Sequence, residues 1–176
     1  MSKVITIFGS SFPKEDDEQY NIAYNLGAKL AQNKFEICTG GFYGIMEAAS
    51  KGALDNGAEV YGVTVTLWGS DPNRYITREI RCLNVFERIE KLMEFADAFV
   101  ILQGGTGTLL ELAAVWEYAN KKLMDSKPIV CHSSMWKEVV NVMDKQMIYE
   151  NREPGLVKCF DTVDEIVESL LQTIGN

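Results

Sequence analysis

The chain contains few of the residues that hold transition metals: one histidine, His132, and four scattered cysteines. The cysteines, at positions 38, 82, 131 and 159, form no Cys-x-x-Cys pair, so the spacing of a structural zinc site is absent. The same scatter gives no disulfide framework of the kind found in small secreted domains. We therefore expect no metal site and no cofactor.

Positive charge is also scarce. The 17 lysines and arginines stand against 25 aspartates and glutamates, which gives a formal net charge of −8. Because proteins bind nucleic acid largely by neutralising phosphates with cations, this balance argues against a nucleic-acid partner. A small anionic ligand needs only a local positive site, so the acidity does not exclude one.

Long apolar runs are missing. No stretch approaches the eighteen consecutive apolar residues of a membrane-spanning helix, and the apolar run in the opening MSKVITIFGSS is too short for a signal peptide. Apolar residues nevertheless make up 47% of the 176 residues and charged residues 24%, an ordinary globular balance. We expect a soluble cytoplasmic protein with no membrane contact.

What the sequence does contain is a regular alternation of short apolar segments with longer segments of helical period. Strands are expected at 4–8, 35–39, 59–65, 81–85, 98–102, 128–132 and 157–160. Helices are expected from about 17, over 44–56, 87–95, 107–120 and 133–146, and after a cap at 161 or 162. Strands that are apolar on both faces, each followed by a helix, predict a mainly parallel sheet of about six or seven strands covered on both sides. The fold class is therefore α/β, a Rossmann-like doubly wound sheet, with residues 1–176 as a single domain.

Three of these strands end in small residues: Gly9-Ser10-Ser11, Gly40-Gly41 and Gly104-Gly105. In parallel α/β sheets, ligands bind outside the carboxyl ends of the strands. We therefore predict that the three loops converge on one edge of the sheet and form the binding site.

The loop Gly104-Gly105-Thr106-Gly107-Thr108 suits an anion best. Glycines ahead of a helix let its first N–H groups approach a phosphate, and the two threonine hydroxyls could donate to it. The spacing is neither that of a Walker loop nor Gly-x-Gly-x-x-Gly. The alternative is that the glycines only make a tight strand-to-helix turn.

Two charged residues near this loop also allow two interpretations. Thr108-x-x-Glu111 has the spacing of a capping box, in which Glu111 would only bond back to the helix start. Arg88 lies in the charged run 87–91, a pattern typical of a solvated helix face. Local sequence alone does not separate these interpretations from catalytic ones.

The segment FERIEKLMEFADAFVILQGGTGTLLE, residues 86–111, resembles the Lonely Guy family of nucleoside 5′-monophosphate phosphoribohydrolases, which have often been labelled lysine decarboxylases. The family reads Arg-Lys-x-x-Met, then an Asp-Ala-Phe strand, then Pro-Gly-Gly-x-Gly-Thr-x-x-Glu. The matching residues are Arg88, the strand entry 97–99, Gly104, Gly105, Gly107, Thr108 and Glu111. The stretches at 8–11 and 40–53 match the family's first and second loops, so the resemblance runs to about residue 130.

The resemblance implies cleavage of the N-glycosidic bond of an AMP-like nucleotide, as in cytokinin activation, to free base and ribose 5-phosphate. It implies that Arg88 and Glu111 are the catalytic pair, with Glu111 suited to stabilise an oxocarbenium-like ribose or to orient water. It also implies a homodimer or higher homo-oligomer. A helix bearing Trp116, Tyr118 and Leu123 would suit the contact, and the alternative is that this face is buried within the monomer. The implied substrate-binding residues are Ser10, Gly40, Gly41, Gly104, Gly105, Thr106, Gly107 and Thr108.

The chain departs from the family pattern at five positions. Gln103 replaces the loop proline, Ile89 the lysine after the arginine, Phe42 a third glycine, Glu47 the glycine that ends the second loop, and Glu117 a common threonine. The phosphate-holding positions are kept, whereas positions that shape the base and ribose pocket vary. The departures leave a second hypothesis, a nucleotide- or molybdenum-cofactor-binding carrier without turnover.

The two hypotheses differ in geometry. An enzyme requires Arg88 and Glu111 to face one cleft beside the glycine loop, whereas a Glu111 bonded only to its helix cap favours a carrier.

Overall fold

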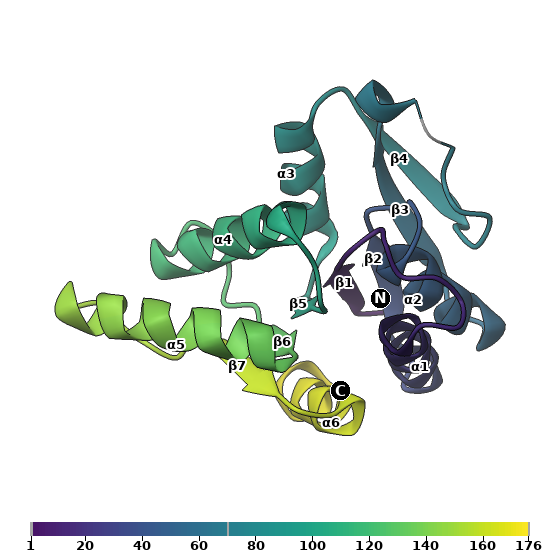
Figure 1. Ribbon diagram of the computed structural model, residues 1–176. Helices are drawn as coiled ribbons and strands as arrows, with labels where there is room; N and C mark the ends of the chain where they lie inside the picture. Colours follow the sequence, from purple (N-terminus) through teal and green to yellow (C-terminus); the bar gives the residue numbers. More distant parts are fainter. Residues whose placement is uncertain (1, 70, 176) are drawn as a thin grey trace.

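The computed structural model describes residues 2–69 and 71–175, and within them seven parallel strands form one sheet in the order β4-β3-β2-β1-β5-β6-β7 (Figure 1). The strands are β1 (Val4–Phe8), β2 (Glu36–Thr39), β3 (Val60–Val65), β4 (Arg78–Cys82), β5 (Ala98–Ile101), β6 (Ile129–His132) and β7 (Val157–Phe160). The helices are α1 (Glu18–Gln32), α2 (Ile45–Asp55), α3 (Val85–Phe95), α4 (Thr106–Asn120), α5 (Ser134–Tyr149) and α6 (Val163–Ile174), with a 3-10 turn at Thr66–Trp68. The predicted α/β Rossmann-like fold is confirmed.

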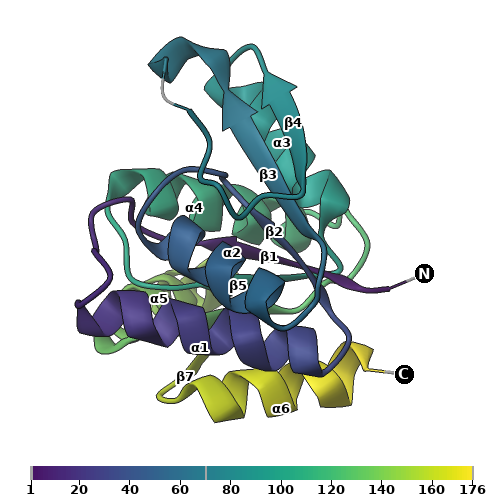
Figure 2. The ribbon, with the colours of Figure 1, turned by 90° about the vertical axis from the view of Figure 1, so that its right-hand side faces the viewer.

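Helices cover both faces of the sheet. Helices α1, α2 and α6 pack on one face and α3, α4 and α5 on the other, an arrangement that Figures 1 and 2 show from two sides. Side chains alternate along each strand. Ile5 and Ile7 of β1 therefore join the core under α1 and α2, while Phe8 stacks on Phe99 of β5 on the other face, with ring centroids 6.0 Å apart. This two-sided burial explains why the central strands are apolar throughout.

The fourth strand lies three residues earlier than the predicted 81–85. It pairs with β3 alone and forms an edge of the sheet, where Arg78, Glu79 and Arg81 are exposed. A half-solvated edge strand carries polar residues, so the apolar-run criterion missed its start. The next helix begins correspondingly earlier, because the Asn84 side chain accepts bonds from the N–H groups of Phe86 and Glu87.

The three glycine-containing loops lie at the same, carboxyl-terminal edge, because β1 has β2 and β5 as its two parallel neighbours. The Ser10 N–H donates to the Gln103 carbonyl at 3.0 Å, and the Ile45 N–H donates to the Ser10 carbonyl at 2.8 Å. The first loop is therefore bonded by its backbone to both of the others. The predicted convergence of the loops is confirmed.

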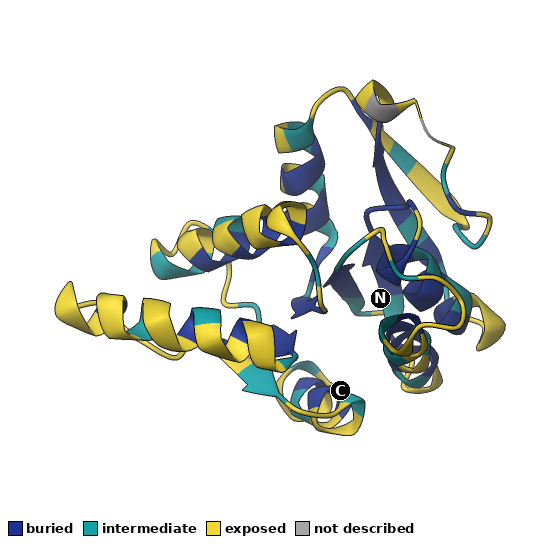
Figure 3. Cartoon of the chain, viewed as in Figure 1, coloured by how far each residue is buried: buried dark blue, intermediate teal, exposed yellow. Residues whose placement is uncertain are grey.

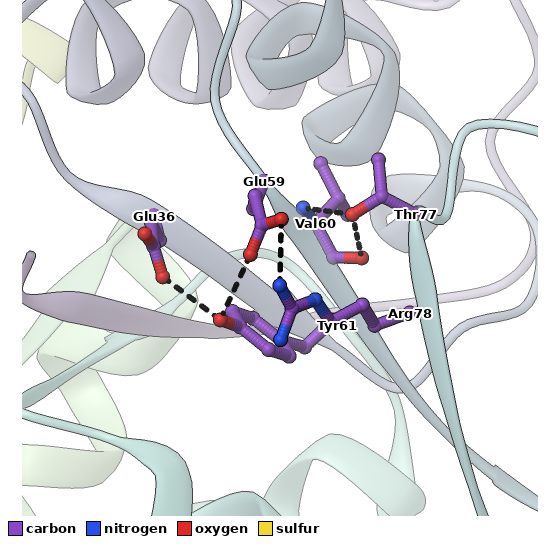
Figure 4. A network of polar contacts seen from close by, with 6 residues as sticks. All are labelled: Glu36, Glu59, Val60, Tyr61, Thr77 and Arg78. Carbon is purple, nitrogen blue, oxygen red and sulfur yellow. Dashed lines mark hydrogen bonds and ion pairs between the residues drawn. The ribbon is translucent and has the colours of Figure 1, made fainter.

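The opposite edge of β2, β3 and β4 carries a polar network (Figure 4). The Tyr61 hydroxyl donates to the carboxylates of Glu36 and Glu59, at 3.0 and 3.2 Å, and Arg78 pairs with Glu59 at 3.0 Å. The Thr77 hydroxyl extends the network, because it accepts a hydrogen bond from the Val60 N–H and donates one to the Val60 carbonyl. These bonds connect the first residues of three adjacent strands.

None of the helices in the described ranges combines the length and apolarity needed to cross a bilayer.

Candidate functional site

A cavity of about 460 Å³ opens where the three loops meet. The loop after β1, the turn between β2 and α2, one side chain of α3 and the first turns of α4 line it. Its residues are Gly9, Ser10, Ser11, Phe42, Tyr43, Met46, Arg88, Gly105, Thr106, Gly107, Thr108 and Glu111. A larger cavity of about 550 Å³ lies at the opposite edge, between the starts of β6 and β7, away from all three glycine loops.

Arg88 lies at the base of the first cavity and is only 4% exposed. Its Nε donates to the Val63 carbonyl at 2.9 Å, and its Nη1 lies 3.0 Å from Glu111 Oε1. The guanidinium also contacts Met46 Sδ at 3.9 Å and lies over the Phe42 ring, 6.0 Å from its centroid. Arg88 is therefore a fixed, buried cation and not part of a solvated helix face.

Glu111 is the partner of this cation and is 8% exposed. Helix α4 begins at Thr106, with Gly105 at the cap position and no side-chain cap bond, so Thr108 already lies inside the first turn. The capping-box interpretation of Glu111 is therefore excluded: no side chain caps α4, and the Glu111 carboxylate bonds to Arg88. Burial raises the pKa of the Glu111 carboxyl above its ordinary value, while the Arg88 charge and hydrogen bond partly lower it.

The glycine loop leaves empty space in front of the first turn of α4. A Cβ added at Gly105 or Gly107 would meet no atom within 4 Å, so no neighbouring side chain requires a glycine there. The first N–H groups of a helix lack intrahelical partners and form its positive end. Open space at this end is what an anion requires for close approach.

The predicted substrate-binding residues fall into two groups. Five of the eight line the cavity: Ser10, Gly105, Thr106, Gly107 and Thr108. Three lie outside its lining: Gly40, Gly41 and Gly104.

Each residue of the second group has close neighbours within the protein. A Cβ on Gly40 would lie 1.7 Å from Arg88 Nη2, and one on Gly104 would lie 2.1 Å from Thr108 Oγ1. Gly41, with φ +79°, receives a bond at its carbonyl from the Asn73 N–H at 2.9 Å. Close packing thus accounts for these three glycines.

Sequence reasoning missed several lining residues. Gly9 and Ser11 flank the predicted Ser10, and their place beside it in the strand-end loop was the available signal. Phe42 lines the cavity at a position where the chain departs from the Lonely Guy pattern. Tyr43 lies just before α2 and Met46 in its first turn, where apolar side chains are equally typical of a core.

The arrangement places a buried carboxylate and guanidinium beside an unobstructed helix N-terminus. Within the described part of the chain, no group of three or more histidine, cysteine, aspartate or glutamate side chains is placed to hold a metal ion. The residues in the cavity are suited to bind an anion and to stabilise or transfer charge next to it.

A family model and individual relatives of this chain point to the same family. The model of the SLOG cluster4 family matches residues 2–155. A cytokinin riboside 5′-monophosphate phosphoribohydrolase of Rhodococcoides fascians is 29% identical over 73% of this chain, and one of Arabidopsis thaliana is 30% identical over 72%. The matches span 66% and 60% of those two proteins, less than two thirds of either.

Among solved structures, the molybdenum cofactor binding protein of Rippkaea orientalis has the same fold, with a TM-score of 0.78 over 99% of this chain and 98% of its own, at 19% identity. Since the family model covers most of the chain, the chain belongs to the SLOG cluster4 family, and its resemblance to the Lonely Guy phosphoribohydrolases is confirmed.

Proposed function

We propose that the chain hydrolyses the N-glycosidic bond of a nucleoside 5′-monophosphate and releases free base and ribose 5-phosphate. The observation that carries this proposal is the buried Arg88–Glu111 pair, which lines the same cavity as the open N-terminus of α4. The relatives from Rhodococcoides and Arabidopsis, named as phosphoribohydrolases, support it.

The phosphate binds at the start of α4 in this proposal. Residues 105–108 line the cavity at the helix start, where the first N–H groups lack intrahelical partners, and Thr106 and Thr108 add two hydroxyls. A dianionic phosphate gains from both the unpaired N–H groups and the helix dipole. The ribose then lies one turn further along α4, beside Glu111.

Glu111 acts on the ribose in the reaction. The bond between C1′ and the base nitrogen breaks, its electron pair leaves with the base, and the base takes up a proton from solvent, to which Glu111 later returns the proton that it accepts from water. The Glu111 carboxylate stabilises the positive charge that develops on the ribose and accepts a proton from the water that attacks C1′. Arg88 holds the carboxylate in place and favours its ionised form.

Turnover of a panel of nucleoside monophosphates, AMP and cytokinin nucleotides included, tests the proposal by measurement of free base and ribose 5-phosphate. Glu111→Gln keeps the shape and the hydrogen bond to Arg88 but removes the charge. We expect it to lower kcat at least about 100-fold, or ~2.7 kcal/mol of transition-state stabilisation.

The matched control is Glu117→Gln, which alters an exposed glutamate on the same helix that bonds Asn120 and lies outside the cavity. It should leave kcat unchanged. Equal rates for Glu111→Gln and wild type would remove Glu111 from the mechanism. No release from any monophosphate by the wild type would instead favour the nucleotide- or molybdenum-cofactor-binding carrier.

A further inference from the structure

A second cavity of about 470 Å³ adjoins the first and shares Ser11 and Tyr43 with it. We call it the side cavity. Its walls are residues 11–15 of the loop after β1, Tyr20 of α1, the start of α2 and the Arg74-Tyr75 pair ahead of β4. A ligand with its phosphate at α4 and its sugar beside Glu111 has this cavity within reach of its far end.

One carboxylate of the side cavity, that of Glu47, is close enough to Arg74 and Tyr20 to act on both electrostatically. Glu47, in the first turn of α2, is half-buried, and the described part of the chain gives its side chain no hydrogen bond and no ion pair. The other carboxylate there, that of Glu15, is paired with Lys51. Burial, and next the nearby Glu47 charge, raise the pKa of Tyr20 to about 12. Glu47 is also one of the positions at which the chain departs from its relatives' motif.

The side cavity also contains a guanidinium held in one orientation. Arg74 lies over the Tyr75 ring, with Cζ 5.0 Å from the ring centroid, and its Nη2 donates to the Tyr75 hydroxyl at 2.8 Å. A stacked guanidinium keeps its remaining N–H donors in the plane of its fork. Tyr43, which is 49% exposed, offers a ring surface on the wall shared by the two cavities.

A carboxylate only accepts hydrogen bonds and a guanidinium only donates them. Of the purine bases, guanine fits this pair best, because it presents two adjacent donors, N1–H and the 2-amino group, and two adjacent acceptors, O6 and N7. Adenine has one amino group next to a ring acceptor, which a carboxylate would repel. Hypoxanthine keeps N1–H, O6 and N7 but lacks the 2-amino donor.

We propose that the side cavity is a base-recognition site for guanine, an inference that rests on the proposed function. Glu47 accepts from N1–H and the 2-amino group, Arg74 donates to O6 and N7, and Tyr43 stacks on the ring. A pterin carries the same 2-amino-4-oxo edge, so a pterin phosphate is a second source of this chemistry. Glu47 is then the residue that sets base preference.

The test uses the full chain with GMP, IMP and AMP, and measures both kcat/KM for base release and Kd by calorimetry. We expect GMP to exceed AMP by at least about tenfold in both quantities, with IMP between them. Glu47→Gln should reduce the GMP-to-AMP ratio about tenfold, because it weakens GMP binding and removes the repulsion of adenine. Glu117→Gln, at an exposed glutamate outside both cavities, should leave the ratio unchanged.

The outcomes separate this inference from the proposed function. Turnover of AMP equal to or faster than that of GMP, or a ratio unaffected by Glu47→Gln, overturns guanine recognition and leaves the hydrolase intact. Tight binding of GMP that depends on Glu47, without turnover, supports the inference and contradicts the hydrolase. Tighter binding of a pterin phosphate than of GMP, again dependent on Glu47, would support recognition of the 2-amino-4-oxo edge and identify a pterin as the ligand that carries it.

Discussion

Gly40 shows how a single missing side chain makes room for the Arg88–Glu111 pair. A Cβ at this position would lie 1.7 Å from Arg88 Nη2 and 2.6 Å from Met46 Sδ. Real Cβ atoms do not approach that closely, so any larger residue must displace the guanidinium or the backbone. We infer that Gly40 contributes by admitting Arg88 and not by touching the substrate.

Gly40→Ala should therefore lower kcat through Arg88. We expect a loss of at least about tenfold, because the guanidinium can no longer reach both Val63 and Glu111. Initial-rate kinetics of base release measure it. In an Arg88→Ala background the same substitution should have little further effect, since coupled residues are not additive. Fully additive losses would show that Gly40 does not act through Arg88.

The raised pKa of Glu111 fixes the direction of the pH dependence. Burial shifts the carboxyl above its ordinary value of 4.5, so protonation in the folded protein begins at a higher pH than for a free glutamate. A reaction that needs the carboxylate must then lose activity, as pH falls, at a midpoint above 4.5. A profile of kcat/KM against pH, with circular dichroism to confirm folding, checks this expectation. An acid limb at or below pH 4.5 would contradict it.

At the scale of the elements, sequence patterns predicted best where burial is two-sided. Helix α6 and its cap were predicted closely, since Thr162 and Glu165 form a true capping box. By contrast, the same local spacing at Thr108 and Glu111 allowed a cap as one interpretation, and the structure has no such cap. Helix α4 starts three residues earlier than a cap at Thr108 would place it, because Gly105 takes the cap position, and this frees Glu111 to meet an arginine 23 residues away in sequence. A pattern within a few residues of sequence cannot predict a contact between side chains that far apart in the chain.

The polar network across β2, β3 and β4 yields a prediction for sheet stability (Figure 4). Tyr61→Phe removes the donor that Glu36 and Glu59 share, and leaves two carboxylates facing one another. We expect a loss of about 1 kcal/mol in the free energy of unfolding, measured by urea denaturation. Tyr149→Phe, at a side chain 81% exposed, is the matched control and should be neutral. No loss in Tyr61→Phe would show that the network contributes nothing to stability.

At the scale of the whole molecule, α4 and the turn after it present apolar side chains to solvent. Leu109, Leu110, Tyr118 and Leu123 are 43%, 42%, 36% and 65% exposed, whereas Trp116 of the same helix is buried in the core. Figure 3 shows that much of the outer surface of α4 and α5 is exposed. Apolar surface of this kind is typical of a contact between copies. We propose a homodimer in which Tyr118 and Leu123 take part.

Light scattering after size-exclusion chromatography tests the dimer. The wild type should have twice the mass of one chain, and Tyr118→Arg should shift it toward the monomer, because a buried unpaired charge opposes association. Leu67→Arg, at a residue 68% exposed in the 3-10 turn, is the control and should keep the wild-type mass. A monomeric wild type would refute the proposal.

The seven-stranded sheet and the edge on which the loops meet were predicted from alternation alone, because a parallel sheet imposes both. The contents of the cavity were predicted only in part. Arg88 and Glu111 came from the family resemblance, whereas Tyr43 and Met46 have the same sequence signature as core residues. Which apolar residue faces a cavity depends on how three separate loops pack, and periodicity within one segment carries no such information.

The central position of β1 has a consequence for synthesis of the chain. A ribosome completes Ser10, Gly40 and Arg88 before it makes β5 and α4, yet β1 pairs with β5 across about ninety residues of sequence. Until Glu111 emerges, the nascent chain carries the Arg88 cation without its carboxylate partner. The N-terminal half therefore cannot complete its folded interior alone, and the candidate site can form only after β5 and α4 have been made and have joined it.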